Sequence, residues 1–202
     1  MEANDKRAQI LEAAIRRFAH FGVQKTTLTE IADDLGMTKQ ALAYYYPDKN
    51  SLSEAVEALI LTEFFTNVEA HLAQAPSAAE AIMDLVEVKK TFFEKYAMLM
   101  RAAGPELMQQ HSKAADAREG ARQRLTHLMA QRLEQGVGSG ELKPLNAPEV
   151  ASLVFDTMTA FEQCVVGRQM IPDARTFSEL CSRQKAVLQL MMNGLREEAW
   201  KN

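Results

Sequence analysis

The chain has 202 residues, of which 47% are hydrophobic and 25% are charged, so it can bury a sizeable core and is neither fibrous nor disordered. Its 23 Lys and Arg against 27 Asp and Glu give a net charge of −4, which excludes a protein that coats nucleic acid by charge alone. The first residues lack the apolar stretch of a signal peptide, and no run approaches the roughly 20 apolar residues that span a bilayer. We therefore expect a cytoplasmic protein without a membrane partner.

The residue types that carry catalysis or bind metals are sparse. Cys164 and Cys181 are too few for a disulfide scaffold, and their helical surroundings predict buried apolar side chains. The four histidines lie far apart and lack the spacing of zinc or di-iron ligands: His20, His71, His111 and His127. No Gly-rich phosphate loop or nucleophile elbow is present either. We expect no enzyme activity, no metal and no cofactor.

Helical periodicity dominates the chain, and its prolines fall between periodic segments, which predicts an all-α fold. The first helix is predicted from about Asp5 to His20, with Gly22 just beyond its end. Thr27 and Glu30 have the spacing of a capping box at the start of a second helix, which ends at Gly36. A third, short helix follows the N-cap Thr38 and stops at Pro47. Two short helices joined by a turn containing glycine are typical of a helix-turn-helix.

The remaining sequence predicts further helices and a second domain. The predicted ranges are 49–75, 77–103, 105–111, 113–135, 147–168 and 174–198, with a Gly- and Pro-rich loop before residue 147. In the first of these helices the apolar face changes by half a turn between Leu52 and Phe65, as expected of a helix that connects two domains. We predict a helix-turn-helix domain at 1–50 and a larger helical domain at 51–202.

The most informative run is GMTKQALAYYYPDK, residues 36–49. Three successive tyrosines on a helix point about 100° apart, so they cannot all face one core. Tyr46 follows Leu42 by four residues and can share its buried face, so we expect Tyr44 and Tyr45 to project outward. Outward tyrosines beside Lys39 and other polar side chains suit contacts with phosphates and base edges. The alternative is a surface helix whose aromatic side chains pack on a neighbour.

Residues 8–60 resemble the DNA-binding domain of the tetracycline-repressor (TetR/AcrR) family of bacterial transcriptional regulators. The matching features, in order, are Phe21 and Gly22, Thr26 and Thr27, Ile31 and Ala32, Gly36 to Lys39, Leu42, Tyr45 to Pro47, Lys49 and Leu52. The total length and the all-helical remainder also match the family. The resemblance implies a homodimeric repressor that a small-molecule effector releases from a palindromic double-stranded DNA operator.

The resemblance also implies roles for individual residues. Thr27 and Lys49 would contact phosphates, and five residues would enter the major groove: Thr38, Lys39, Gln40, Tyr44 and Tyr45. The family often has Gly or Pro at the position of Gln40, and usually Tyr at that of Ala43. We therefore expect Gln40 to add a contact with DNA and Ala43 to lack the one that the family's tyrosine makes.

Charge within the first 52 residues limits how DNA could bind. This segment has seven Lys and Arg and seven Asp and Glu, so it is neutral. Bulk attraction cannot supply the affinity, which requires Lys25, Lys39 and Lys49 to face DNA and two subunits to act together.

The second predicted domain would hold the dimer interface and the effector site. Two apolar stripes occur on the last helices: Val150, Leu153, Val154, Thr157 and Phe161, then Phe177, Leu180, Cys181, Gln184, Leu188, Met191 and Leu195. A dimer interface and the core of a single chain explain these stripes equally well.

The predicted effector pocket consists of Phe65, Lys89, Phe92, Phe93, Tyr96, Met100, Met158 and Glu162. Lys89 interrupts an apolar stripe, where an unpaired ammonium would be costly. It could extend to solvent, pair with an acidic residue such as Glu162, or bind an anionic effector. Ordinary core packing is the alternative to a pocket. A second alternative is a helix-turn-helix adaptor that contacts proteins and not DNA.

Overall fold

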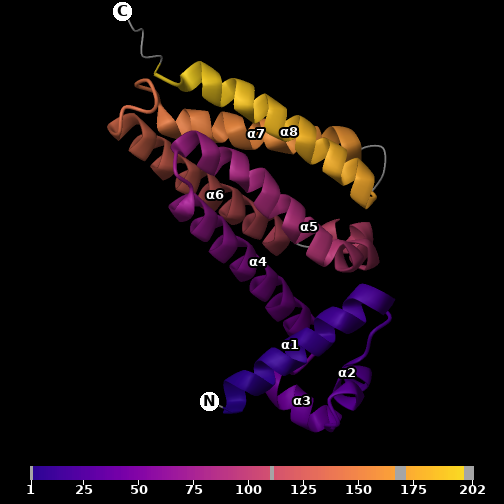
Figure 1. Cartoon of the computed structure of the whole chain (residues 1–202). Coiled ribbons are helices and arrows are strands. Elements are labelled where there is room, and N and C mark those ends of the chain that lie inside the picture. Colours follow the sequence, from indigo (N-terminus) through magenta and orange to yellow (C-terminus); the bar gives the residue numbers. More distant parts are fainter. Residues whose placement is uncertain (1, 110–111, 167–171, 198–202) are drawn as a thin grey trace, which may run out of the picture. The chain divides into compact units, whose positions relative to one another are not determined.

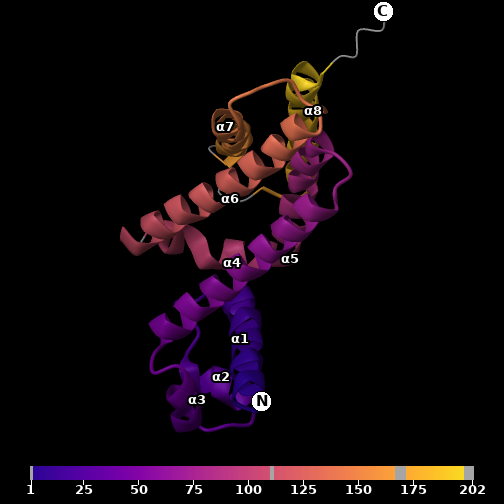
Figure 2. The same cartoon turned by 90° about the vertical axis from the view of Figure 1, so that its left-hand side faces the viewer.

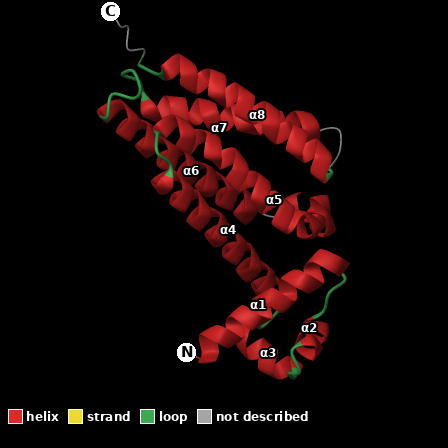
Figure 3. Ribbon diagram, in the orientation of Figure 1, coloured by secondary structure: helices red, strands yellow, loops and turns green. Residues whose placement is uncertain are grey.

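The computed structural model describes residues 2–109, 112–166 and 172–197, and these residues form eight helices without a β-strand (Figures 1 and 3). The all-α prediction is confirmed. The helices are α1 Glu2–Phe21, α2 Leu28–Asp34, α3 Lys39–Tyr45, α4 Lys49–Gln74, α5 Ala78–Gln109, α6 Ser112–Gly138, α7 Ala147–Val166 and α8 Ala174–Leu195. Within these described ranges, none of the helices has the length and apolar character needed to span a membrane.

The chain divides into two compact units. The first unit comprises Met1–Glu63 and Lys95–Gln110, and the second comprises Phe64–Glu94 and His111–Asn202. Helices α4 and α5 therefore contribute to both units. The first unit includes more of the chain than the segment 1–50, because parts of α4 and α5 pack with it. The functional boundary at residue 50 stays a prediction.

The core of the first unit is built by one apolar stripe from each of its helices. Helix α1 packs on α2, and α2 packs on α3 (Figure 2). The fully buried anchors of this core are Ile10, Ala14, Phe18, Ile31, Ala32, Leu42 and Leu52. Removing such side chains from water is the main source of stability for a domain of this size.

The predicted caps and turns of the first unit are confirmed. Gly22 and Gly36 have φ angles of 81° and 61°, a left-handed conformation that favours glycine after a helix end. Thr27 and Glu30 form the predicted capping box, and the Thr38 hydroxyl accepts a hydrogen bond from the N–H of Ala41 at 3.1 Å. These local contacts set where α2 and α3 begin.

The second unit is a helical bundle whose loops are tied to helix ends. The carboxylate of Glu141, in the loop between α6 and α7, accepts hydrogen bonds from the N–H groups of Ala78 and Ala79 at 2.6 and 2.9 Å. It thereby satisfies unpaired donors at the start of α5. The core of the bundle contains buried apolar side chains from all five of its helices: Phe65, Val68, Leu72, Ile82, Leu85, Val86, Met129, Leu133, Val154, Met158, Leu188 and Met192.

Some expectations about the helices are confirmed and others are not. The break predicted before Pro105 is absent, because α5 continues through it to Gln109. A proline removes one backbone N–H, and a helix of 32 residues can continue through it. The face change in α4 is confirmed by Leu52 and Phe65, buried in different units, but Leu59 and Leu61 are exposed. Cys181 is buried as predicted, and the side chain of Cys164 lies outside the described residues.

Candidate nucleic-acid interface

Helix α3 presents a polar face because one residue anchors its other face. Leu42 is fully buried in the core of the first unit, and the backbone N–H of Tyr46 caps the helix end on the carbonyl of Leu42. The side chains of Lys39, Gln40 and Tyr44 are exposed. A short helix held by its caps and one apolar anchor can therefore offer an ammonium, an amide and a phenol to a partner.

The three successive tyrosines have different environments. Tyr44 is 83% exposed, as predicted, and Tyr46 is 6% exposed and belongs to the core, also as predicted. Tyr45 does not project outward, because it is half-buried and packs against the core of the first unit. Its ring meets that of Tyr44 edge-on, with centroids 5.3 Å apart. The ring of Tyr45 thus supports the exposed ring of Tyr44.

Arg7 joins the start of α1 to the tyrosines and was not among the predicted contacts. Its guanidinium carbon lies 5.9 Å from the ring centroid of Tyr45 and 5.7 Å from that of Tyr46. These distances permit cation–π attraction, and the Arg7 side chain is exposed. Nothing in the local sequence pattern signals this contact, since it joins residues 38 and 39 positions apart.

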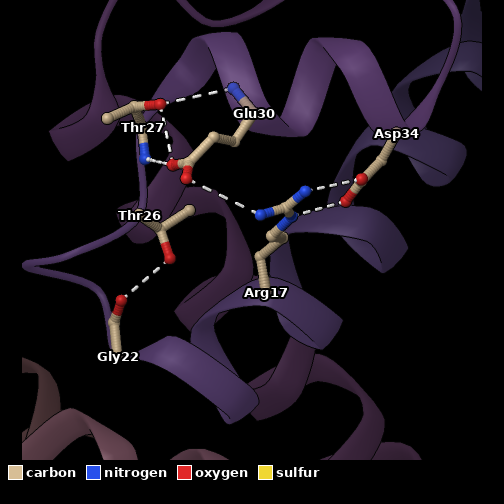
Figure 4. Close-up of polar contacts among 6 residues, drawn as sticks. All are labelled: Arg17, Gly22, Thr26, Thr27, Glu30 and Asp34. Carbon is tan, nitrogen blue, oxygen red and sulfur yellow. Dashed lines mark hydrogen bonds and ion pairs between the residues drawn. The ribbon is translucent and has the colours of Figure 1, made fainter.

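Thr27 lies at the start of α2 within a compact hydrogen-bond network (Figure 4). Its N–H and its hydroxyl both donate to Glu30 Oε2 at 2.8 Å, and its hydroxyl oxygen accepts from the N–H of Glu30 at 3.3 Å. The hydrogen bonds from Thr27 hold the pKa of Glu30 below its usual value. The predicted phosphate contact would therefore compete with Glu30 for the hydroxyl of Thr27.

Arg17 of α1 completes this network from the other side. Its Nε and Nη2 donate to the two carboxylate oxygens of Asp34 at 2.6 and 2.7 Å, and its Nη1 lies 3.7 Å from Glu30 Oε1 (Figure 4). The paired hydrogen bonds from Arg17 hold the pKa of Asp34 below its usual value. The buried hydroxyl of Thr26 donates to the carbonyl of Gly22 at 2.9 Å and fixes the turn between the helices.

Lys49 is the first residue of α4, and its ammonium already has one hydrogen-bond partner within the first unit. Its Nζ donates to the carbonyl of Gln24 at 3.0 Å, and the side chain is half-buried. The preceding Asp48 caps the helix, because its carboxylate accepts a hydrogen bond from the N–H of Ser51 at 2.7 Å. An ammonium has three N–H groups, so Lys49 can keep the Gln24 contact and still donate to a phosphate.

All seven predicted DNA contacts belong to the first unit. Five lie on α3 or its cap, and the other two start α2 and α4: Thr38, Lys39, Gln40, Tyr44, Tyr45, Thr27 and Lys49. The structure brings these side chains into one unit, with Lys39, Gln40 and Tyr44 the most accessible on α3. The seven roles themselves remain predictions.

The aromatic residues of the predicted effector pocket pack closely within the second unit. Phe65 is buried, and the guanidinium of Arg124 lies 4.3 Å from its ring centroid. Phe92 meets Phe64 edge-on at 5.1 Å between centroids. Phe93 stacks on Phe177 with centroids 3.7 Å apart. These contacts are those of a packed core, the alternative that the sequence left open.

Lys89 pairs with Glu162, one of the alternatives open from the sequence. Its ammonium contacts Glu162 Oε1, and the amide of the buried Gln184 donates to the same oxygen at 3.3 Å and to the carbonyl of Met158 at 2.7 Å. Burial lowers the pKa of Lys89 to about 8, and the electrostatic interaction with Cys181 opposes part of this shift. This polar cluster joins α5, α7 and α8 inside the second unit.

Two residues of the predicted pocket belong to the first unit. Tyr96 is buried, and its hydroxyl donates to Glu63 Oε2 at 2.7 Å, while Met100 is half-buried. Burial favours the neutral carboxyl of Glu63, but hydrogen bonds from Lys95 and Tyr96 hold its pKa below its usual value. The eight predicted residues are thus divided between the two units, and the pocket stays a prediction.

The apolar stripe on α8 is largely buried within the chain, whereas on α7 only Val154 of the predicted stripe is buried. Val154, Leu180 and Leu188 are buried in the core of the second unit. Leu153 of α7 is 53% exposed and Leu190 of α8 is 72% exposed. In the described parts of these helices, the exposed leucines are therefore Leu153, which belongs to the predicted stripe on α7, and Leu190, which lies outside the predicted stripe on α8.

Comparisons with known proteins agree with this geometry. A family model for bacterial regulatory proteins of the tetR family matches residues 10–56, which include α2, α3 and most of the first unit's core. The HTH-type transcriptional regulator TtgR of Pseudomonas putida is 34% identical over 95 residues, which are 47% of this chain and 43% of TtgR. The aligned part of the chain thus spans less than half the length of that relative.

Other relatives extend over nearly the whole chain. The HTH-type transcriptional regulator RutR of Escherichia coli is 27% identical over 199 residues, covering 95% of this chain and 91% of RutR. The crystal structure of a transcriptional regulator from Cytophaga hutchinsonii has a TM-score of 0.84 at 26% identity, covering 95% of this chain and 99% of that one. The capped helix-turn-helix and these similarities together support a bacterial regulator of the TetR/AcrR family.

Proposed function

We propose that this protein is a DNA-binding transcriptional repressor that recognises a palindromic operator as a homodimer. The observation that carries the proposal is the exposed trio Lys39, Gln40 and Tyr44 on α3, held outward by the buried Leu42. An α-helix of this kind fits the major groove, where amide and ammonium groups read base edges. Thr27 and Lys49 would fix the orientation through phosphates.

A dimer supplies the DNA affinity that the neutral segment 1–52 lacks on its own. Two recognition helices on one face of DNA must meet grooves about 34 Å apart, so the pairing of subunits sets the spacing of half-sites. The exposed Leu153 and Leu190 on α7 and α8 support a dimer surface in the second unit. Burying these two leucines against a second subunit would remove their apolar surface from water and so favour association.

Substitution of Leu190 by glutamate should convert the dimer to a monomer. Operator binding should weaken as a result, because it requires two subunits. A charge placed at an apolar contact must be desolvated without a partner when subunits associate. Sedimentation equilibrium at several concentrations measures the change. Leu61→Glu makes the same substitution at an exposed leucine of α4 and should leave the dimer intact. Equal dissociation of both variants, or of neither, would remove Leu190 from the interface.

We further propose that an effector bound in the second unit releases the repressor. Helix α4 contributes Leu52 to the core of the first unit and Phe65 to that of the second, which supports a role for α4 in transmitting the effect. A ligand that binds one arrangement of α4 more tightly would change the population competent for DNA. Coupling of about 1 to 3 kcal/mol is typical and corresponds to roughly 5- to 150-fold derepression.

Selection of bound fragments from genomic DNA tests the proposal most directly. Recovery of a palindromic site would establish DNA binding, subunit symmetry and half-site spacing in one experiment. Recovery of no specific fragment, with a folded protein, would contradict the proposal. It would favour the alternative of an adaptor that uses its helix-turn-helix for protein contacts.

Lys49→Ala should weaken operator binding by about 5- to 10-fold and reduce its dependence on salt. Each phosphate contact that is lost lowers the slope of log K against log salt by about 0.9. Titration of labelled operator at several salt concentrations measures both quantities. Lys143→Ala, which removes an exposed lysine of the second unit, is the control. An unchanged slope for Lys49→Ala would show that Lys49 does not contact a phosphate.

A further inference from the structure

Arg17 is the one member of the network around Thr27 that bridges two helices and two carboxylates. It lies on α1 and contacts Asp34 and Glu30 on α2 (Figure 4). Its side chain is 23% exposed, whereas that of the adjacent Arg16 is 65% exposed and pairs only loosely with Glu12, at 3.9 Å. Two neighbouring arginines therefore have different environments.

The carboxylate of Glu30 is the nearest negative charge to the hydroxyl of Thr27. Both donors of Thr27 are bound to one oxygen of Glu30, at 2.8 Å. A DNA phosphate that approached Thr27 would meet the charge of this carboxylate, and like charges at close range repel strongly. For the hydroxyl of Thr27 to donate to the phosphate, it must also turn away from Glu30.

Arg17 can offset both of these costs. Its guanidinium lies between the carboxylates of Glu30 and Asp34 and offsets part of their negative charge. Its Nη1 lies 3.7 Å from Glu30 Oε1, beyond hydrogen-bond distance but close enough to donate after a small adjustment. Arg17 can therefore bind Glu30 more tightly at the moment when the hydroxyl of Thr27 leaves it, while its other donors keep Asp34.

We propose that Arg17 is a positioning residue for DNA binding, which neutralises Glu30 and holds it while Thr27 exchanges that carboxylate for a DNA phosphate. Arg17 acts through Glu30 and does not itself touch DNA. This inference rests on the proposed function and assigns a role to residues outside the predicted contact set. It also explains why a carboxylate beside a phosphate-binding threonine does not prevent binding.

The test compares two arginines that differ by one position. Arg17→Gln should weaken binding of the selected operator by about tenfold, because the carboxylate of Glu30 then faces a phosphate without a neighbouring guanidinium in each subunit. Arg16→Gln removes the same charge from the same helix and should weaken binding by less than about twofold. Equal effects of the two substitutions would overturn the proposal, since only the overall charge would then matter.

A second variant separates this role from a structural one. In Arg17→Gln combined with Glu30→Gln, the charge beside Thr27 is removed and the capping box is retained, because glutamine serves at that position. Operator affinity should return to within about twofold of the wild type. If Arg17 only anchored α2 to α1, the second substitution would not restore binding, and the proposal would be overturned. Thermal unfolding of each variant confirms that the first unit is folded.

The partnership with Thr27 gives an independent readout. Thr27→Val should weaken binding in the wild type and have a smaller effect in Arg17→Gln, because the contact it removes is already impaired. Additive effects would contradict the proposed exchange. If the wild-type protein itself binds no operator, the proposed function fails first, and the two failures are therefore distinguishable.

Discussion

Replacing Lys39 by glutamate should reduce operator binding by more than about 100-fold at physiological salt. Lys39 is the first residue of α3 and is exposed, at the end of the helix that the Thr38 cap fixes. The substitution changes the charge by two in each subunit, and in a dimer both recognition helices carry it. A carboxylate directed at a phosphate or at an acceptor on a base edge both loses a contact and adds repulsion.

Fluorescence anisotropy with labelled operator measures the loss, and Arg16→Glu is the matched control. Arg16 is also an exposed cation of the first unit, so the control makes the same charge reversal away from α3. It should reduce binding by less than about fivefold through long-range attraction alone. If Lys39→Glu and Arg16→Glu reduced operator binding equally, Lys39 would act through overall charge and not through a contact in the major groove.

The helix caps and turns of the first unit could be predicted because they depend on residues that are close together in the sequence. A threonine followed three residues later by a glutamate can satisfy the first donors of a helix, and Thr27 and Glu30 do so. Gly22 and Gly36 follow helices in a conformation that other residues rarely adopt. Tyr46, four residues after Leu42, is buried with it on the same face.

The contacts that could not be predicted join residues distant in the chain. Arg7 reaches the rings of Tyr45 and Tyr46, and Arg17 reaches Asp34, through the packing of α1 against the other helices. Tyr45 is half-buried for the same reason, since the exposure of a residue at the edge of an apolar face depends on what packs beside it. Helical periodicity defines a face but not its partner.

The same limit applies to the second unit. The stripe of Leu180 and Leu188 was equally consistent with an interface or a core, and burial assigns both residues to the core. The position of Lys89 in an apolar stripe predicted that its charge needs compensation, and Glu162 was among the partners considered. The sequence could not choose between this pair and an effector, because only the tertiary fold brings Lys89 of α5 and Glu162 of α7 together.

Lys89→Met should lower the free energy of unfolding by about 2 kcal/mol, although it removes a charge from an apolar region. The substitution leaves the carboxylate of Glu162 with the amide of Gln184 and without its ammonium partner. Breaking a buried ion pair by removing one member is costly, because the remaining charge is poorly solvated. The side chains of Lys89 and Glu162 are 22% and 32% exposed. Because water partly solvates the charge that remains, the expected loss of stability is smaller than for a fully buried pair.

Adding Glu162→Met to Lys89→Met should recover most of this stability, because no unpaired charge then remains and the two methionines can fill the site. Urea unfolding of the wild type, both single variants and the double variant gives the coupling energy of the pair. Additive losses would show that the two side chains do not interact. A favourable coupling energy would mean that Lys89 and Glu162 neutralise each other. An anionic effector could then bind Lys89 only by displacing Glu162. A ligand that releases DNA equally well from the wild type and the double variant would exclude the pair from the effector site.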